Sequence, residues 1–221
     1  MPAPAGMVVT PEGRHRRRLE TKQEEDHENL VGRRGYRRIC PGVAGSLGEC
    51  RPGQRRPARA SIVLPAEAAE PLRTAAKDLQ AYVRMICEVE LPIVTDGRTV
   101  EGCGLYIGAC GPAQPADLPE AGANPETAAL RVRDGNVLFA GRWPTPTAFA
   151  VYSFLEDTLG VRWFAPGALW EYVPKGTPGE LAVEVAERVM VPGTSPRVWS
   201  GHAWTPDWKA WSLRNKAVLS E

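Results

Sequence analysis

Residues 136–167 read NVLFAGRWPTPTAFAVYSFLEDTLGVRWFAPG, and the rest of the chain can be interpreted outward from them. The apolar run 137–140, closed by Gly141, predicts a buried strand. Residues 161–164, Val-Arg-Trp-Phe, predict a second extended segment, which Pro166-Gly167 would turn. The stretch therefore predicts strand, helix and strand, with both strands in one sheet.

The segment between these strands has the pattern of an amphipathic helix. Thr145 is predicted to be its N-cap and Pro146 its first residue, where the missing N–H costs nothing. One face carries apolar residues at helical spacing: Ala148, Val151, Phe154, Leu155 and Leu159. Gly160 suits the left-handed residue that follows such a helix.

Three runs in this stretch carry a resemblance to a known family. Residues 141–142 (GR), 150–156 (AVYSFLE) and 159–167 (LGVRWFAPG) resemble the end of an accessory domain. That domain precedes the catalytic barrel in family 67 α-glucuronidases and in related large bacterial glycosidase-like proteins. It is similar in fold to the second domain of β-hexosaminidases. The resemblance runs from about Ile62 to the last residue and leaves out residues 1–60.

The segment before this stretch supplies further elements of an α/β fold. Apolar residues recur every three or four positions between Leu72 and Ile86, which predicts a helix ending near Cys87. Asp134-Gly135 is a strong hairpin turn signal. Strands are predicted at 61–64, 91–94, 104–108, 130–133, 136–139, 172–174 and 181–185, with a loop at 111–126.

This order predicts an α/β (α+β-like) two-layer sandwich, a mixed sheet with two main helices on one face. The predicted core lies between the sheet and the two helices: Leu79, Val83, Val137, Phe139, Val151, Phe154 and Leu155. Residues 61–195 form the predicted accessory domain. The resemblance implies that residues 196–221 are the beginning of a catalytic barrel. A barrel needs about 250 residues, so we expect a truncated, fragmentary protein.

Residues 1–60 are predicted to be a disordered basic tail. They carry 13 Lys and Arg against 7 Asp and Glu, and their composition offers too little apolar surface to form a core. A basic arm can bind nucleic acid, but this one has Tyr36 as its single aromatic residue and no recognised motif. We therefore expect no nucleic-acid partner.

The remaining sequence signals exclude several classes of site. Five cysteines without a C-x-x-C pair, and three histidines without metal-ligand spacing, predict no metal and no disulfide framework. Cys87 and Cys110 are expected to be buried thiols. The glycines at 102–111 do not form a dinucleotide motif, so no cofactor is expected. No apolar window is long enough for a membrane span. The N-terminus lacks a signal-peptide core, although the resembled proteins are often exported, so localisation stays open.

No catalytic residue is predicted. Glycosidases need two carboxylates facing each other across the scissile bond. Glu156 and Asp157 are adjacent on a helix and point about 100° apart, so they cannot converge on one bond. Asp207 is expected to cap the helix that follows it. The resemblance places the family's catalytic acids in the barrel, outside this chain.

Aromatic residues are the candidate contacts, either with carbohydrate or with the barrel. Four of the seven tryptophans lie within residues 199–211. The candidate contact residues are Arg142, Trp143, Trp163, Trp170, Trp204 and Asp207. The sequence thus predicts an accessory domain that supports a missing C-terminal barrel and has no turnover alone, with an apolar, partly exposed tryptophan surface that promotes self-association. A stand-alone carbohydrate-binding module, bound to oligo- or polysaccharide, is the first alternative, and an interaction protein with a basic tail is the second.

Overall fold

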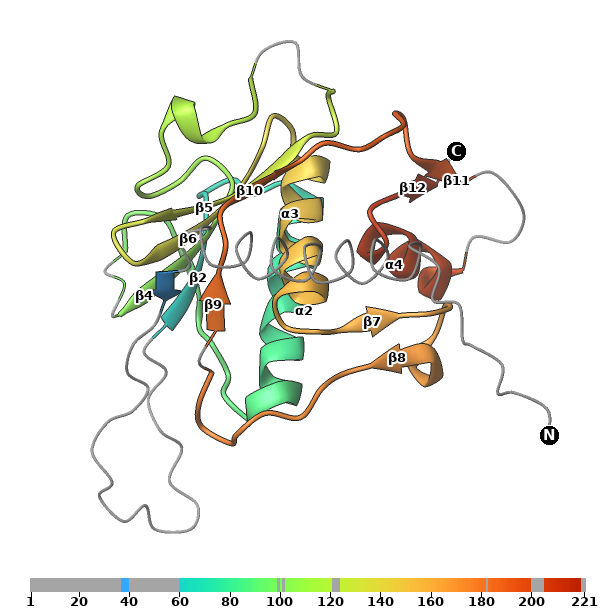
Figure 1. The fold of residues 1–221 in the computed structure, drawn as a ribbon, viewed down its shortest axis with the longest axis horizontal. Helices are drawn as coiled ribbons and strands as arrows, with labels where there is room; N and C mark the ends of the chain where they lie inside the picture. Colours follow the sequence, from blue (N-terminus) through green and yellow to red (C-terminus); the bar gives the residue numbers. More distant parts are fainter. Residues whose placement is uncertain are drawn as a thin grey trace, which may run out of the picture. The chain divides into compact units, whose positions relative to one another are not determined.

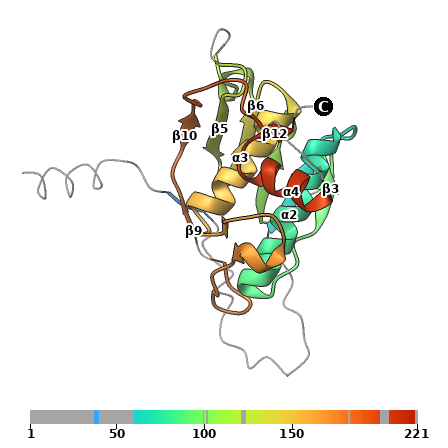
Figure 2. The ribbon, with the colours of Figure 1, turned by 90° about the vertical axis from the view of Figure 1, so that its right-hand side faces the viewer.

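A six-stranded mixed sheet covered by two long helices forms the centre of the fold (Figures 1 and 2). The strand order is β10-β5-β6-β4-β2-β3. Helices α2 and α3 pack on one face of this sheet, which confirms the predicted fold class. The computed structural model describes residues 37–39, 60–98, 100, 102–120, 124–181, 183–199 and 205–219.

The sheet combines parallel and antiparallel pairing. Its strands are β2 (Ala60–Leu64), β3 (Ile93–Thr95), β4 (Cys103–Ile107), β5 (Ala128–Arg133), β6 (Asn136–Gly141) and β10 (Arg188–Met190). Strand β2 is parallel to β3 and β4, and β4 is parallel to β6. The β5–β6 hairpin is antiparallel, and β10 adds antiparallel to β5. Asp134 and Gly135 both have positive φ, as the predicted Asp-Gly turn requires.

Helix α2 spans Glu70–Cys87 and matches its predicted range. Pro71 lies in its first turn, where an intrahelical N–H bond is not needed. The apolar positions seen in the sequence are all buried, and Tyr82 and Cys87 join them. The predicted loop at 111–126 contains a short 3-10 turn, η1 (Pro115–Asp117).

Helix α3 spans Pro144–Asp157, so the predicted start at Thr145 and Pro146 was wrong. Trp143 occupies the N-cap position, and Pro144 rather than Pro146 is the first helical residue. Proline there needs no N–H partner, so the helix can begin two residues earlier than predicted. The hydroxyl of Thr147 donates to the Trp143 carbonyl oxygen at 2.9 Å.

Every side chain of α3 from Pro146 to Leu155 is buried. A helix buried all round has neighbours on every side. All seven predicted core residues are buried in one cluster, so the prediction of the core is confirmed. Phe139 and Phe154 meet edge to face within it, with ring centroids 5.4 Å apart.

An outer layer covers the side of the helices that faces away from the sheet (Figure 2). It contains a hairpin of β7 (Arg162–Trp163) and β8 (Glu171–Tyr172), joined through the 3-10 turn η2 (Ala168–Trp170). It also contains β11 (Val198–Trp199), α4 (Pro206–Arg214) and β12 (Val218–Leu219), with β11 and β12 parallel. We name these elements the outer layer.

The prediction that the strand after α3 joins the main sheet was wrong. Strand β7 pairs with β8 in a separate two-stranded sheet. Gly160, with φ of 78°, turns the chain after α3 as predicted. Trp163 then packs against Tyr82 of α2, so the chain crosses the helices instead of returning to the sheet.

The region predicted to be a tail lies mostly outside the described residues. Within it, Arg37–Ile39 form strand β1, which pairs antiparallel with β9 (Val183–Val185). The rest of the predicted tail before Ala60 lies outside the described residues, so its disorder stays a prediction. Strand β2 begins at Ala60, one residue before the strand predicted at 61–64.

Candidate functional site

The five described residues among the six proposed contacts lie on different parts of the fold. Arg142 and Trp143 precede α3, whereas Trp163 and Trp170 follow it. Since α3 has 14 residues, about 20 Å separate its two ends. Asp207 is exposed in the first turn of α4, and Trp204 lies outside the described residues.

Asp207 does not cap α4, contrary to the expectation. The N-cap is Thr205, whose hydroxyl oxygen accepts from the Trp208 amide at 3.4 Å. Asp207 lies one residue inside the helix, after Pro206, where its charge favours the positive end of the helix dipole.

Trp163 is buried, with 5% of its surface exposed, rather than exposed as expected. Tyr82 and Tyr152 meet its ring edge to face, at centroid distances of 5.6 and 5.9 Å. Its indole N–H donates to the Tyr82 hydroxyl at 2.7 Å. Its carbonyl oxygen accepts from the Trp211 indole at 3.0 Å, so Trp163 contacts the segment that was expected to begin the barrel.

Arg214 joins this aromatic cluster to two carboxylates. Its guanidinium binds both oxygens of Asp78, at 3.1 and 3.2 Å, and one oxygen of Glu171 at 2.6 Å. Tyr82 donates to the other oxygen of Glu171 at 2.8 Å, and Tyr152 donates to Asp78 at 3.1 Å. We name the following five residues the arginine cluster: Asp78, Tyr82, Tyr152, Glu171 and Arg214. It combines α2, α3, β8 and α4.

The arginine cluster was missed by the sequence analysis. Its members lie up to 136 positions apart in the chain, and each resembles an ordinary residue of a helix or strand. The one local signal is on α2, where Asp78 and Tyr82 are one turn apart and next to the buried Leu79.

The environment of the cluster favours one protonation state. Burial raises the pKa of Tyr82, and burial also raises the pKa of Tyr152 well above the ordinary tyrosine range. Burial alone would lower the pKa of Arg214, but Asp78, Tyr82 and Glu171 outweigh it and raise this pKa. The tyrosines therefore stay neutral hydrogen-bond donors, and Arg214 stays charged.

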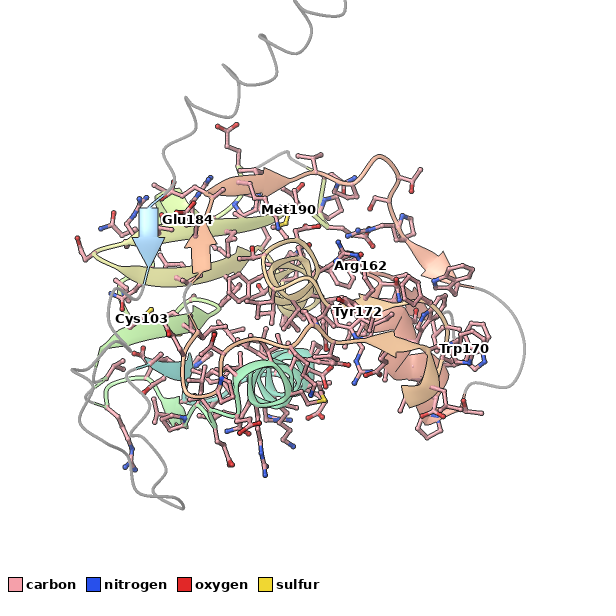
Figure 3. The ribbon with its side chains drawn as sticks, turned by 60° about the horizontal axis from the view of Figure 1, so that its bottom comes forward. Cys103, Arg162, Trp170, Tyr172, Glu184 and Met190 are labelled. Atoms are coloured by element: carbon pink, nitrogen blue, oxygen red, sulfur yellow. The ribbon has the colours of Figure 1, made fainter. Side chains whose placement is uncertain are left out.

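The tip of the β7–β8 hairpin is apolar and exposed. Residues 164–170 read FAPGALW and contain no charge. Leu169 has 97% of its surface exposed, Phe164 68% and Trp170 56%. The tip is ordered by its backbone, because the Phe164 amide donates to the Trp170 carbonyl and the Trp170 amide to that of Gly167. Figure 3 shows Trp170 and Tyr172 on this hairpin, at the other end of the fold from Cys103.

Two further ion pairs fasten the C-terminal part of the outer layer. Arg197 binds Glu126 through its side chain at 3.0 Å and lies over the Phe149 ring, 4.7 Å from the centroid. Lys216 pairs with Glu156 of α3. Both pairs are partly buried, so salt screens them less than it screens fully exposed pairs. Arg197 and Lys216 therefore each contact α3, through Phe149 and Glu156.

Four carboxylates that lie in neighbouring pairs are each bound by a cation. Glu156 and Asp157 pair separately, with Lys216 and Arg188. Asp78 and Glu171 do approach a common point, but the Arg214 guanidinium binds both of them there. A hydrolase requires its acid and its nucleophile to face the sugar instead.

Other classes of site are also limited by the structure. Within the described ranges, no group of three or more His, Cys, Asp or Glu residues could hold a metal ion. None of the helices in that part of the chain is long and apolar enough to cross a membrane. Cys87 and Cys110 are buried thiols, as predicted.

Comparison with known proteins gives a weak likeness to glycoside hydrolases. No protein-family model matches the chain. No curated protein matches it. Among solved structures, it is similar to the GH20 β-N-acetylhexosaminidase of Streptomyces coelicolor A3(2), with 16% identity and a TM-score of 0.41 over 64% of this chain. The N-acetyl-β-hexosaminidase of Streptomyces plicatus aligns with 16% identity and a TM-score of 0.39 over 66% of the chain.

These alignments span 24% of the length of each enzyme. Sequence identities of 16% and TM-scores of 0.41 and 0.39 do not show that this chain shares the activity of these enzymes. The alignments name hexosaminidases, and they give no support to the narrower resemblance to family 67 α-glucuronidases.

Proposed function

We propose that this chain is a non-catalytic accessory α/β domain of a glycoside-hydrolase-like protein, and that its outer layer docks a catalytic barrel. The glycosidase context comes from the sequence resemblance of residues 141–167. The ion pairs that hold Glu156, Asp157, Asp78 and Glu171 support a non-catalytic role for these carboxylates, because a glycosidase needs its two carboxyl groups facing the sugar.

The observation that carries the proposal is the parallel β11-α4-β12 unit. Parallel strands occur almost only in larger sheets that are covered on both faces. Here β11 and β12 have two residues each, and in the described structure β12 pairs with β11 alone. Such a pair is too small to be stable by itself. Further parallel strands of a barrel, added beside this unit, would complete it.

Exposed apolar residues in the same layer support a docked partner. The tip residues Phe164, Leu169 and Trp170 are exposed, and so are Val198 and Trp199 of β11. A contiguous apolar patch of several hundred Å² is typical of a protein interface, and we propose that these residues together form one. Both groups lie on elements that contact α4, because Trp199 packs against Trp211 and the hairpin is bound by Trp211 and Arg214.

The test combines an activity assay with a docking assay. The purified chain is incubated with aryl β-glycosides and glucuronyl-xylooligosaccharides, and we expect no turnover. It is also co-expressed with the polypeptide encoded directly downstream, and we expect a one-to-one complex. Leu169→Asp should weaken that complex. Val189→Asp is the matched control, because Val189 is an exposed apolar residue on β10, outside the outer layer.

Two results would contradict the proposal. Turnover that is lost in Glu156→Gln or Asp207→Asn would place catalysis within this chain. The docking role would be contradicted if the chain failed to bind the downstream polypeptide, and if Leu169→Asp and Val189→Asp did not differ in that binding assay.

A carbohydrate-binding module is the second candidate, and exposed tryptophans favour it. Trp143 has 61% of its surface exposed beside the exposed Arg142, which could supply a polar contact to a sugar that stacks on the indole. A monodisperse chain that binds oligosaccharide, and loses this binding in Trp143→Ala or Trp170→Ala, would establish this alternative.

A further inference from the structure

Arg214 binds one carboxylate on α2 and one on the β7–β8 hairpin. Without it, two negative charges would face each other there. Asp78 belongs to α2, and Glu171 belongs to β8 of the hairpin. Each side chain has less than a fifth of its surface exposed, and each carboxylate is bound by the same guanidinium. The charge of Arg214 is thus part of what holds the hairpin against α2.

Among the described residues, the hairpin's side-chain hydrogen bonds to α2 pass through the Tyr82 hydroxyl, and Trp163 also packs on the Tyr82 ring. Tyr82 accepts from the Trp163 indole and donates to Glu171, so both strands of the hairpin meet at this oxygen. Tyr82 is a neutral donor and cannot compensate a charge. Without Arg214, the two carboxylates would share a partly buried space with hydroxyl donors alone, and unpaired buried charges are strongly destabilising.

We propose that Arg214 couples the docking of α4 to the position of the β7–β8 hairpin. When α4 is docked, its guanidinium neutralises Asp78 and Glu171 and the hairpin closes on α2. When α4 leaves, the carboxylates repel each other and the hairpin opens. The apolar tip at 164–170 then moves with it, so binding at α4 changes what the tip presents. This coupling belongs to the chain itself and does not depend on the proposed barrel.

Two contacts reinforce the coupling from the α4 side. Trp211 and Asn215 donate to the Trp163 carbonyl oxygen, at 3.0 and 3.4 Å. They join α4 to the first strand of the hairpin, while Arg214 joins it to the second. By contrast, Lys216 pairs with Glu156 of α3 and no interaction links it to the hairpin among the described residues.

The experiment is amide hydrogen exchange of the full chain. The amides of Phe164 and Trp170 report on the hairpin, since both donate within it. Arg214→Met should speed their exchange by about ten-fold or more, because it leaves two uncompensated carboxylates. Lys216→Met is the matched control, which removes an ion pair of the same segment and should change these amides by less than about two-fold.

The decisive test is a double variant in which one of the two carboxylates is also neutralised. Adding Glu171→Gln to Arg214→Met removes the repulsion and should return the two hairpin amides close to their original rates. Unchanged hairpin exchange in Arg214→Met would overturn the proposal, and so would a double variant that stays open.

A variant that unfolds globally is recognised by the Phe139 amide in the main sheet, which then speeds up by the same factor. In that event Arg214→Lys, which keeps the charge, is compared with Arg214→Gln. Equal opening of the hairpin in these two variants would show that charge is not the cause.

Discussion

Phe154→Ala is the sharpest test of the core. Phe154 has 2% of its surface exposed and packs edge to face on Phe139, with the ring planes at 75°. Burial of such a side chain contributes about 1.5–3 kcal/mol, and the aromatic pair adds about 0.5–1.5 kcal/mol. With the cavity that remains, the expected loss in the free energy of unfolding is about 3–5 kcal/mol.

Urea denaturation followed by far-UV circular dichroism measures this loss, with an unchanged slope against urea as the check on two-state behaviour. Phe164→Ala is the matched control, because the same side chain is 68% exposed there and its removal should cost less than about 0.5 kcal/mol. A loss below about 1 kcal/mol for Phe154→Ala would mean that α3 is packed in another phase.

Two further predictions concern a close approach and a thiol. Gly141→Ala places a Cβ 2.6 Å from the Thr147 amide nitrogen, so it should lower the free energy of unfolding by about 1–3 kcal/mol; Gly193→Ala, with no atom within 4 Å of its added Cβ, should be near neutral in the same urea titration. Burial, and then Asp96, raise the pKa of Cys110 from 9.0 to about 12, so its alkylation at pH 8 should be about 10³-fold slower in the folded than in the unfolded chain. Since the folded pKa is the higher one, the stability contributed by the neutral thiol is complete below pH 9 and is lost as the pH rises toward 12. Rapid alkylation of Cys110 in the native chain, read by mass spectrometry, would contradict this.

The sequence was sufficient for the core because periodicity reports which face of an element is buried. The apolar positions of α2 and the run at 137–140 follow this rule, and the Asp134-Gly135 turn follows from its own backbone preference. Periodicity does not show which element packs on a given buried face of a helix or strand. Strand β7 was therefore assigned to the wrong sheet, although its extended conformation was predicted.

The arginine cluster could not be predicted for a related reason. A charge on a helix face is usually solvated, and nothing in a single sequence shows that Asp78 meets Arg214 across more than a hundred positions. The burial of Trp163 depends on the same tertiary contacts, through Tyr82 and Tyr152. Candidate contacts chosen by residue type alone thus included one that belongs to the interior.

The mixed pairing of β6 has a consequence for the order in which the chain folds. Strand β6 pairs antiparallel with its neighbour in the chain, β5, and parallel with β4, about thirty positions earlier. Closing a short hairpin loses less chain entropy than closing a long crossover. We therefore expect the β5–β6 hairpin and α3 to form the folding nucleus, onto which β4 and β2 assemble. The outer layer would join last, and until then the largely apolar middle of helix α3, residues 146–155, would be an exposed, aggregation-prone surface during synthesis.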